Sequence, residues 1–163
     1  MSQAQKLKTL DDSIQSEIRV KIPRITRIIE SNEMNPAMKR LISEFAVDTF
    51  KIEYYQRRRL NLHVTFGTMA SVAKDAIAKY RNLVNKYYFL ATKEATPDEK
   101  ADLLAAQEAW ESFQRKEVIL LSRIYRKGDI ANNNYLMAYQ KIIRERAIAL
   151  FDRFIQIKEY QAN

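Results

Sequence analysis

Residues 96–128 have the pattern of one long helix with a defined start and a defined stop, and this segment constrains the fold most. Thr96 can accept hydrogen bonds from free amide groups at a helix start, and Pro97 suits the first helical position. Glu99 stands where it can complete a capping box. Gly128 follows two basic residues that complement the helix dipole, and it predicts a left-handed stop.

An apolar stripe runs along this predicted helix at spacings of three and four, the period of one helix face. Its members are Leu103, Ala106, Trp110, Phe113, Leu120, Leu121 and Ile124. We expect Trp110 to be buried between the third, fourth and fifth helices as a core anchor. One charged residue, Glu117, interrupts the stripe.

The predicted fold class is all-α, because two glycines and three prolines in 163 residues are too few for the turns of a sheet protein. Short links between long amphipathic segments favour an antiparallel bundle of four long helices, plus an N-terminal helix that Pro23 kinks or divides. One domain is expected over 1–163, with an N-terminal helical segment at 1–34 and the bundle at 35–163. The predicted helices cover residues 7–31, 35–59, 68–91, 96–128 and 134–160.

The fifth predicted helix also carries a charge, Arg146, within its apolar stripe. Glu117 lies eleven residues before Gly128, and Arg146 lies twelve after Asn134, the expected start of that helix. Each is then about 16–18 Å from the turn, so the two charges should face each other in an antiparallel hairpin. The alternative is that both lie at the edge of a stripe and extend to solvent.

The residues that enzymes and metal sites use are scarce. The chain has no cysteine and one histidine, His63, which leaves no set of imidazole or thiolate ligands for a metal. No glycine-rich phosphate loop and no Glu-x-x-His pattern is present. We therefore expect a protein that is not an enzyme and has no metal or cofactor. No apolar run reaches the roughly 18 residues that a membrane helix needs, and no signal peptide is visible.

The net charge of +8 points to acidic partners. The excess is concentrated towards the C-terminus, where residues 115–163 carry ten basic and five acidic side chains. The one dense basic run is Arg57, Arg58 and Arg59, at the end of the second predicted helix. It is either a solvated helix end or a contact for phosphate or carboxylate groups.

Residues 101–117 (ADLLAAQEAWESFQRKE), a Gly-Asp-Ile turn and residues 144–151 (RERAIALF) resemble the lysozyme inhibitor LprI-like family. Members have a tyrosine-bearing helix, a helix with Ala-Gln-x-x-Trp and a closing helix with an arginine-rich end. The corresponding residues here are Tyr80, Asn85-Lys86-Tyr87-Tyr88, Ala106, Gln107, Trp110 and Arg146. Val47-Asp48-Thr49-Phe50 and Glu53 are similar to the longer, Bacteroidetes-type members. The chain departs from the family by its lack of cysteines and by Gln114-Arg115 after Phe113.

The resemblance implies a non-enzymatic protein of the periplasm or cell envelope that binds a protein partner, for example a cell-wall hydrolase such as a lysozyme or muramidase. We expect structural roles for five residues, Gln107, Trp110, Glu117, Arg146 and Gly128. The basic run Arg57, Arg58 and Arg59 supplies the candidate binding residues. A cationic lysozyme would be repelled at long range by a chain of +8, so an acidic or neutral muramidase is the more natural target.

The alternative function is that of a structural or assembly subunit, cytoplasmic if Met1 is the natural start. Its basic surface would dock on an anionic partner, either lipid headgroups, nucleic acid or an acidic protein. Docking on a polyanion should weaken steeply with salt, whereas a packed protein interface should not. The sequence leaves the oligomeric state open.

Overall fold

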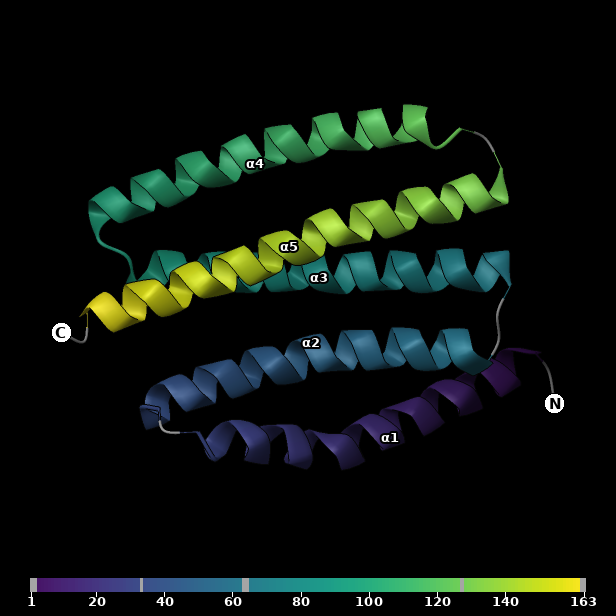
Figure 1. Cartoon of the computed structure of the whole chain (residues 1–163), viewed down its shortest axis with the longest axis horizontal. Helices are drawn as coiled ribbons and strands as arrows, with labels where there is room; N and C mark the ends of the chain where they lie inside the picture. The colour runs from purple at the N-terminus through teal and green to yellow at the C-terminus, as the bar shows by residue number, and fades with distance from the viewer. Residues whose placement is uncertain (1–2, 33, 63–64, 127, 162–163) are drawn as a thin grey trace. The chain divides into compact units, whose positions relative to one another are not determined.

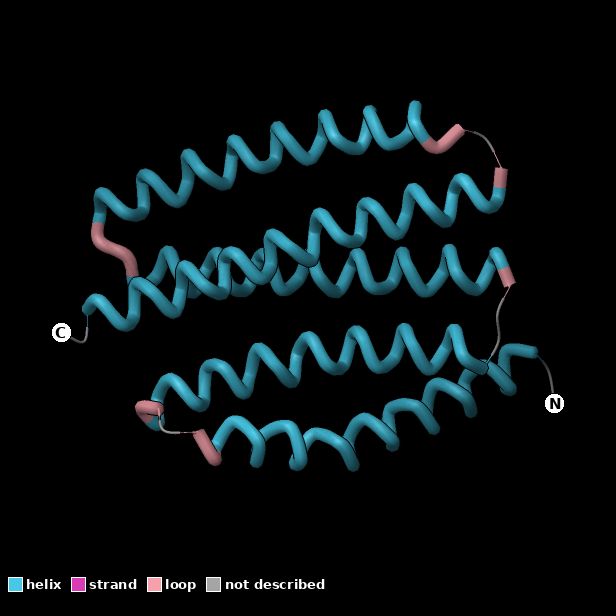
Figure 2. The backbone as a smooth tube through the Cα atoms, in the orientation of Figure 1, coloured by secondary structure: helices cyan, strands magenta, loops and turns pink. Residues whose placement is uncertain are grey.

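The structure is a computed structural model that describes residues 3–32, 34–62, 65–126 and 128–161, and helices account for nearly all of them (Figures 1 and 2). This confirms the all-α fold class, since no strand occurs within these ranges. None of the helices in these ranges has the length and sustained apolar character that a bilayer crossing requires. The helices are α1 (Gln3–Glu30), α2 (Pro36–Leu62), α3 (Phe66–Glu94), α4 (Pro97–Ile124) and α5 (Asp129–Gln161).

The chain divides into two compact units, residues 1–63 and residues 64–163. We call α1 with α2 the N-terminal hairpin, and α3 with α4 and α5 the C-terminal unit. The sequence-based expectation of one domain, with a segment boundary at residue 34, stays a prediction.

The N-terminal hairpin packs α1 against α2 in antiparallel fashion (Figure 1). Its core is formed by Ile14, Ile18 and Tyr54, surrounded by partly buried apolar side chains. Pro23 lies inside α1 without dividing it, and the helix curves along its length (Figure 2). A proline costs a helix one backbone hydrogen bond but does not end it when the rest of the helix is packed.

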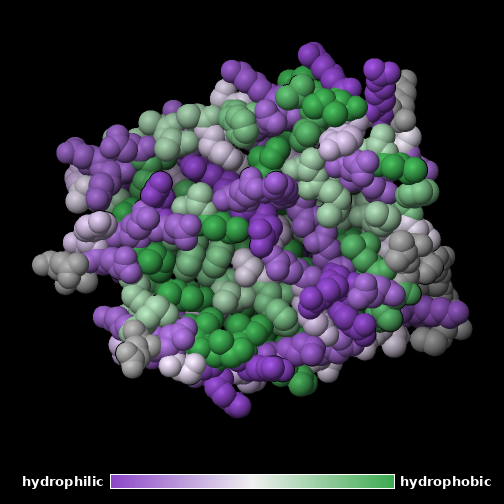
Figure 3. Space-filling model, in the orientation of Figure 1, coloured by the Kyte–Doolittle hydropathy of each residue, from purple (hydrophilic) through white to green (hydrophobic). Residues whose placement is uncertain are grey.

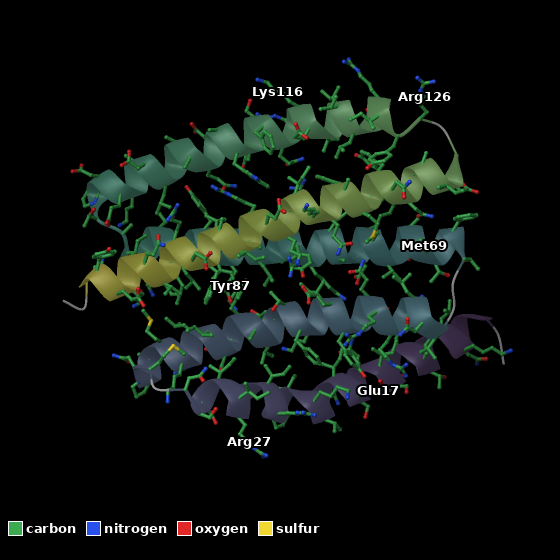
Figure 4. All side chains as sticks on the ribbon, viewed as in Figure 1. Glu17, Arg27, Met69, Tyr87, Lys116 and Arg126 are labelled. Atoms are coloured by element: carbon green, nitrogen blue, oxygen red, sulfur yellow. The ribbon has the colours of Figure 1, made fainter. Side chains whose placement is uncertain are left out.

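Two ion pairs join the helices of this hairpin. The Arg58 guanidinium donates from Nε and Nη2 to the two carboxylate oxygens of Glu17, at 2.8 and 2.9 Å, and the Tyr54 hydroxyl donates to the same carboxylate at 2.7 Å. Arg59 pairs with Asp11 at 3.1 Å. Figure 4 shows Glu17 between the α1 and α2 ribbons. The predicted basic run therefore serves largely to hold α1 on α2.

We expect the hairpin to lose stability in acid through Glu17. The hydrogen bonds from Arg58, and next the one from Tyr54, lower the pKa of the Glu17 carboxyl below its ordinary value of 4.5. A lowered pKa in the folded state means that the stabilisation is complete above the unfolded value and is lost as pH falls through the folded value. Denaturant unfolding between pH 7 and pH 3 should show this acid-dependent loss in the native chain and a smaller one in Glu17→Gln.

The control for that experiment is Glu44→Gln, which removes an exposed carboxylate of the same hairpin that pairs with Arg40 one helical turn away. Exposed pairs of this kind contribute little to stability. The acid dependence of Glu44→Gln should therefore match that of the native chain. An unchanged acid dependence in Glu17→Gln would show that the ion pair does not carry it.

In the C-terminal unit, α3 and α5 run in the same direction and α4 returns between their ends (Figure 1). The apolar stripes of α3 and α5 are buried against each other. The Tyr87 ring meets Phe151 edge-on at 5.2 Å between centroids and lies 6.4 Å from Phe154. Other buried members are Val72, Ala76, Tyr80 and Leu83 of α3 with Leu136, Ile143 and Leu150 of α5.

The predicted start of α4 is confirmed, whereas the predicted left-handed stop at Gly128 is wrong, because the helix is capped at Tyr125 in extended conformation. The Thr96 hydroxyl accepts from the Glu99 amide at 3.4 Å, and the Glu99 carboxylate accepts from the Thr96 amide at 2.8 Å, which is a complete capping box. After α4 the chain reverses at Gly128, whose φ of 128° lies in the region that favours glycine. Lys127, one of the two basic residues expected at this helix end, lies outside the described residues.

The predicted helix bounds near this turn are wrong. Helix α4 ends at Ile124, before Gly128, and α5 begins at Asp129 rather than at Asn134. The first helical hydrogen bond of α5 forms directly after Gly128, because the Asn132 amide donates to the Gly128 carbonyl at 2.9 Å. The Asp129 carboxylate also lies in this first turn, where negative charge complements the helix dipole.

The predicted burial of the α4 stripe is also wrong. Phe113, Leu120 and Ile124 are 51%, 47% and 58% exposed, whereas the buried residues of α4 are Gln107 and Gln114. Figure 3 shows apolar atoms gathered over the C-terminal half of α4. The physical reason is that α3 and α5 already cover each other's apolar faces, so α4 meets them mainly through hydrogen-bonding side chains.

Candidate functional site

The inner side of α4 presents Gln107 and Gln114, which are seven residues apart and therefore lie on one helix face. The Gln107 carbonyl oxygen accepts from Nε and Nη2 of Arg146 on α5, at 3.1 and 2.8 Å. Its amide nitrogen donates to Glu111 at 3.3 Å. Both ends of the Gln107 amide are thus engaged, and the side chain is held in one orientation.

Gln114 is held in the same way two turns further on. Its carbonyl oxygen accepts from Arg81 of α3 at 3.3 Å, and its amide nitrogen donates to the Tyr139 hydroxyl of α5 at 3.1 Å. Arg81 also donates to the Tyr139 hydroxyl, and its guanidinium lies 5.6 Å from the centre of that ring. We call the five side chains of these two clusters (Arg81, Gln107, Gln114, Tyr139 and Arg146) the polar layer.

The predicted pairing of Glu117 with Arg146 is wrong, because Arg146 binds Gln107 instead. The cause is the true start of α5. Arg146 lies seventeen residues after Asp129, and Gln107 lies seventeen residues before Ile124, so these two stand at the same height. Glu117 is seven residues before Ile124. It therefore lies ten residues, or about 15 Å along the helix, beyond the height shared by Gln107 and Arg146.

Trp110 is half-buried, which differs from the predicted core anchor. The Arg146 guanidinium lies over the Trp110 ring at 5.4 Å from its centre, the geometry of a cation–π contact. The guanidinium therefore occupies a place that an apolar neighbour would fill in a core. The ring contributes both to the support of Arg146 and to the wall of an open cleft beside it.

This α3–α4 cleft has a volume of about 290 Å³. Arg81, Val84 and Asn85 line it from α3, and Trp110, Glu111 and Arg115 line it from α4, together with the two buried glutamines. Four residues that carry the family resemblance, Asn85, Gln107, Trp110 and Arg146, thus meet at or directly beside one cavity. They come from three helices, so the sequence alone does not bring them together.

The cleft is electropositive. Burial, and next the positive charge of Arg153, lower the pKa of the Arg146 guanidinium. Within the described part of the chain, Arg81, Arg115 and Arg146 form no ion pair with a carboxylate. Glu111 is the one carboxylate that lines the cleft, and it accepts from Gln107. A cationic site of this kind attracts anionic groups.

The predicted binding residues are in the other unit. Arg58 forms an ion pair with Glu17, and Arg59 forms one with Asp11. The exposed Arg57 guanidinium lies 5.4 Å from the centre of the Tyr54 ring. They do not form a free basic patch. His63 lies outside the described residues, and the residues that the structure does describe contain no acidic, histidine or cysteine cluster that could hold a metal.

Sequence reasoning missed Arg81 and Arg115 as site residues. The available signal was the seven-residue spacing of two glutamines, Gln107 and Gln114, which marks a polar inner face on α4. Arg115 follows the second glutamine directly and reaches the same cleft.

A protein-family model, described as lysozyme inhibitor LprI, matches residues 64–150, which is more than half of the chain. This chain belongs to the lysozyme inhibitor LprI family. The LprI match spans α3, α4 and α5 as far as Leu150, and it includes both walls of the cleft and Arg146. Comparison with curated proteins and with solved structures gives no significant match.

Proposed function

We propose that this LprI-family protein acts as a non-enzymatic binding protein of the cell envelope whose partner is a cell-wall hydrolase of the lysozyme or muramidase class. The observation that carries the proposal is the family match over residues 64–150. The geometry supports it, because Asn85, Trp110 and Arg115 present donor groups and an aromatic surface at an open cleft. Such groups contact the polar or acidic surface of a protein partner.

The charge of the protein narrows the choice of hydrolase. A net charge of +8 repels cationic enzymes at long range and attracts acidic ones. The preferred partner under this proposal is therefore an acidic or neutral muramidase rather than a cationic lysozyme.

We expect weak inhibition of a cationic lysozyme and stronger inhibition of an acidic muramidase, both measured as turnover of a soluble oligosaccharide at low and physiological salt. Like charges should make the cationic enzyme harder to inhibit at low salt, where screening is weakest. Submicromolar inhibition of the cationic lysozyme at low salt would contradict the electrostatic argument.

The control for this assay is an unrelated protein of similar size and net charge. Cell-wall substrates are anionic, so any basic protein can coat them and slow a hydrolase without binding it. The soluble substrate and the charge-matched protein together separate this effect from binding of the enzyme. The proposed function fails if neither class of hydrolase is inhibited more by the native chain than by the control.

A second candidate function is docking of the basic surface on an anionic partner. It is favoured by the ten basic and five acidic side chains of residues 115–163, an excess that lies in the C-terminal unit. Binding to anionic lipid vesicles or to nucleic acid that weakens steeply with ionic strength would support this function.

A further inference from the structure

We propose that the α3–α4 cleft is a carboxylate-binding site in which Arg81 and Arg115 bind the anion and Trp110 forms an apolar wall. The ligand chemistry is a single carboxylate on a small group. It can come from an acidic side chain of a protein or from an acidic sugar. The proposal concerns the cleft alone and does not depend on a hydrolase as the partner.

The first argument is the balance of charge at the cleft. Three guanidiniums, those of Arg81, Arg115 and Arg146, lie in or beside it and are not paired with a carboxylate among the described residues. In the N-terminal hairpin, by contrast, Arg58 and Arg59 each have a carboxylate partner. Arg146 is half-buried, whereas Arg81 and Arg115 are exposed, and Glu111 is the carboxylate in the lining. The cleft therefore has an excess of positive charge, which attracts an anion.

The second argument is the kind of hydrogen-bonding group that the cleft leaves available. The amides of Gln107 and Gln114 are engaged at both ends, so they position Arg146 and Arg81 rather than bind a ligand. Among the described residues, the Arg115 guanidinium and the Trp110 indole N–H have no hydrogen-bond partner. Both groups can only donate, and an ionised carboxylate can only accept.

The third argument is size. A volume of about 290 Å³ is at the lower end of ligand pockets, which span roughly 300–1,000 Å³. It suits one acidic side chain or one sugar ring. Buried Val84 and the exposed part of the Trp110 ring supply apolar surface for the carbon atoms of such a ligand, while the arginines hold its charge.

Trp110 allows a direct test because it is the one tryptophan of the chain. Its fluorescence and its indole N–H resonance can be followed while N-acetylglutamate methylamide is added at constant ionic strength, and the titration is repeated with the glutamine counterpart. The two probes differ only in side-chain charge. We expect a saturable response to the glutamate probe and at least tenfold weaker binding of the glutamine probe.

A second arm identifies the source of the carboxylate. N-acetylmuramic acid is compared with N-acetylglucosamine, which lacks the acidic substituent. Tighter binding of the glutamate probe indicates a protein side chain, and tighter binding of the acidic sugar indicates a saccharide. The proposal is overturned if neither acid perturbs Trp110, or if the neutral probes bind as well as the acids.

Variants test the named residues. Arg115→Gln removes an exposed side chain without a partner, so it should leave the fold intact and weaken binding at least tenfold. Lys116→Gln makes the same change in net charge on the neighbouring residue, whose side chain extends from α4 on the side away from α5 (Figure 4). It should bind within about twofold of the native chain, since Lys116 does not line the cleft and its exposed charge is screened by solvent and salt.

Arg81→Gln is the second binding-site variant and should also weaken the complex. The assignment fails if Arg115→Gln and Arg81→Gln both bind as the native chain does. It fails as well if Lys116→Gln loses as much affinity as Arg115→Gln, because net charge would then explain the effect. Each variant is accompanied by a thermal unfolding curve, and hydrolase inhibition by the native chain is measured separately, so that the two proposals can fail independently.

Discussion

Tyr87→Ala is expected to destabilise the C-terminal unit by about 3–5 kcal/mol, the cost typical of a large aromatic removed from a core. The Tyr87 side chain is 2% exposed and is packed against Phe151 and Phe154 of α5. Its loss removes the aromatic contacts and leaves a cavity between the two helices that form the core. The measurement is denaturant unfolding, followed by circular dichroism and by the fluorescence of Trp110 in the same unit.

The matched control is Phe89→Ala, two residues further along α3. Phe89 is 67% exposed, so its removal should change the free energy of unfolding by no more than about 0.5 kcal/mol. Similar losses for Tyr87→Ala and Phe89→Ala would mean that the inward face of α3 is not the one described.

Gln107→Leu is expected to cost about 1.5–3 kcal/mol, the range for a hydrogen bond to a charged group. Leucine has a similar volume but cannot accept from Arg146, so the half-buried guanidinium loses the acceptor of its two hydrogen bonds. Thermal and denaturant unfolding measure the loss. Combining Gln107→Leu with Arg146→Met should recover part of it, because the stranded charge is then gone.

Glu117→Gln is the control in this series. Glu117 has no part in the polar layer, and its replacement should change the free energy of unfolding by no more than about 0.5 kcal/mol. If Glu117→Gln instead cost more than Gln107→Leu, the pairing first expected from the sequence would be correct and the one in the structure would not.

Sequence periodicity predicted that α3 and α5 exist as amphipathic helices, and in the structure their apolar faces cover each other. It failed for α4. A stripe identifies the apolar face of a helix. It does not tell whether the neighbouring helices have apolar surface that is not already buried against another helix. Phe113 and Leu120 lie at the predicted spacing and are nonetheless about half exposed.

The start of α5 was missed for a different reason. Residues 132–134 are three asparagines, which have low helix propensity and therefore indicate a linker. Tertiary structure overrides this preference, since the Asn133 side chain is buried and donates to the Phe66 carbonyl at 3.4 Å. The error of five residues then shifted the expected partner of Arg146 from Gln107 to Glu117.

The site was the least predictable part of the molecule. The Gln-x-x-Trp pattern identified two residues of α4, but Arg81 and Asn85 belong to a different helix and Arg146 to a third. These residues lie close together only if the start and end of each helix are known to within one helical turn. Helix ends are the least reliable part of a prediction from sequence.

The polar layer also limits how α4 can move. A helix packed only by apolar side chains can slide by one turn and find new contacts of similar quality. A slide of about 5.4 Å along α5 would separate Gln107 from Arg146 and Gln114 from Tyr139 together. Helix α4 therefore either docks in one register or detaches. The cleft between α3 and α4 is formed in the docked state and is lost when α4 detaches.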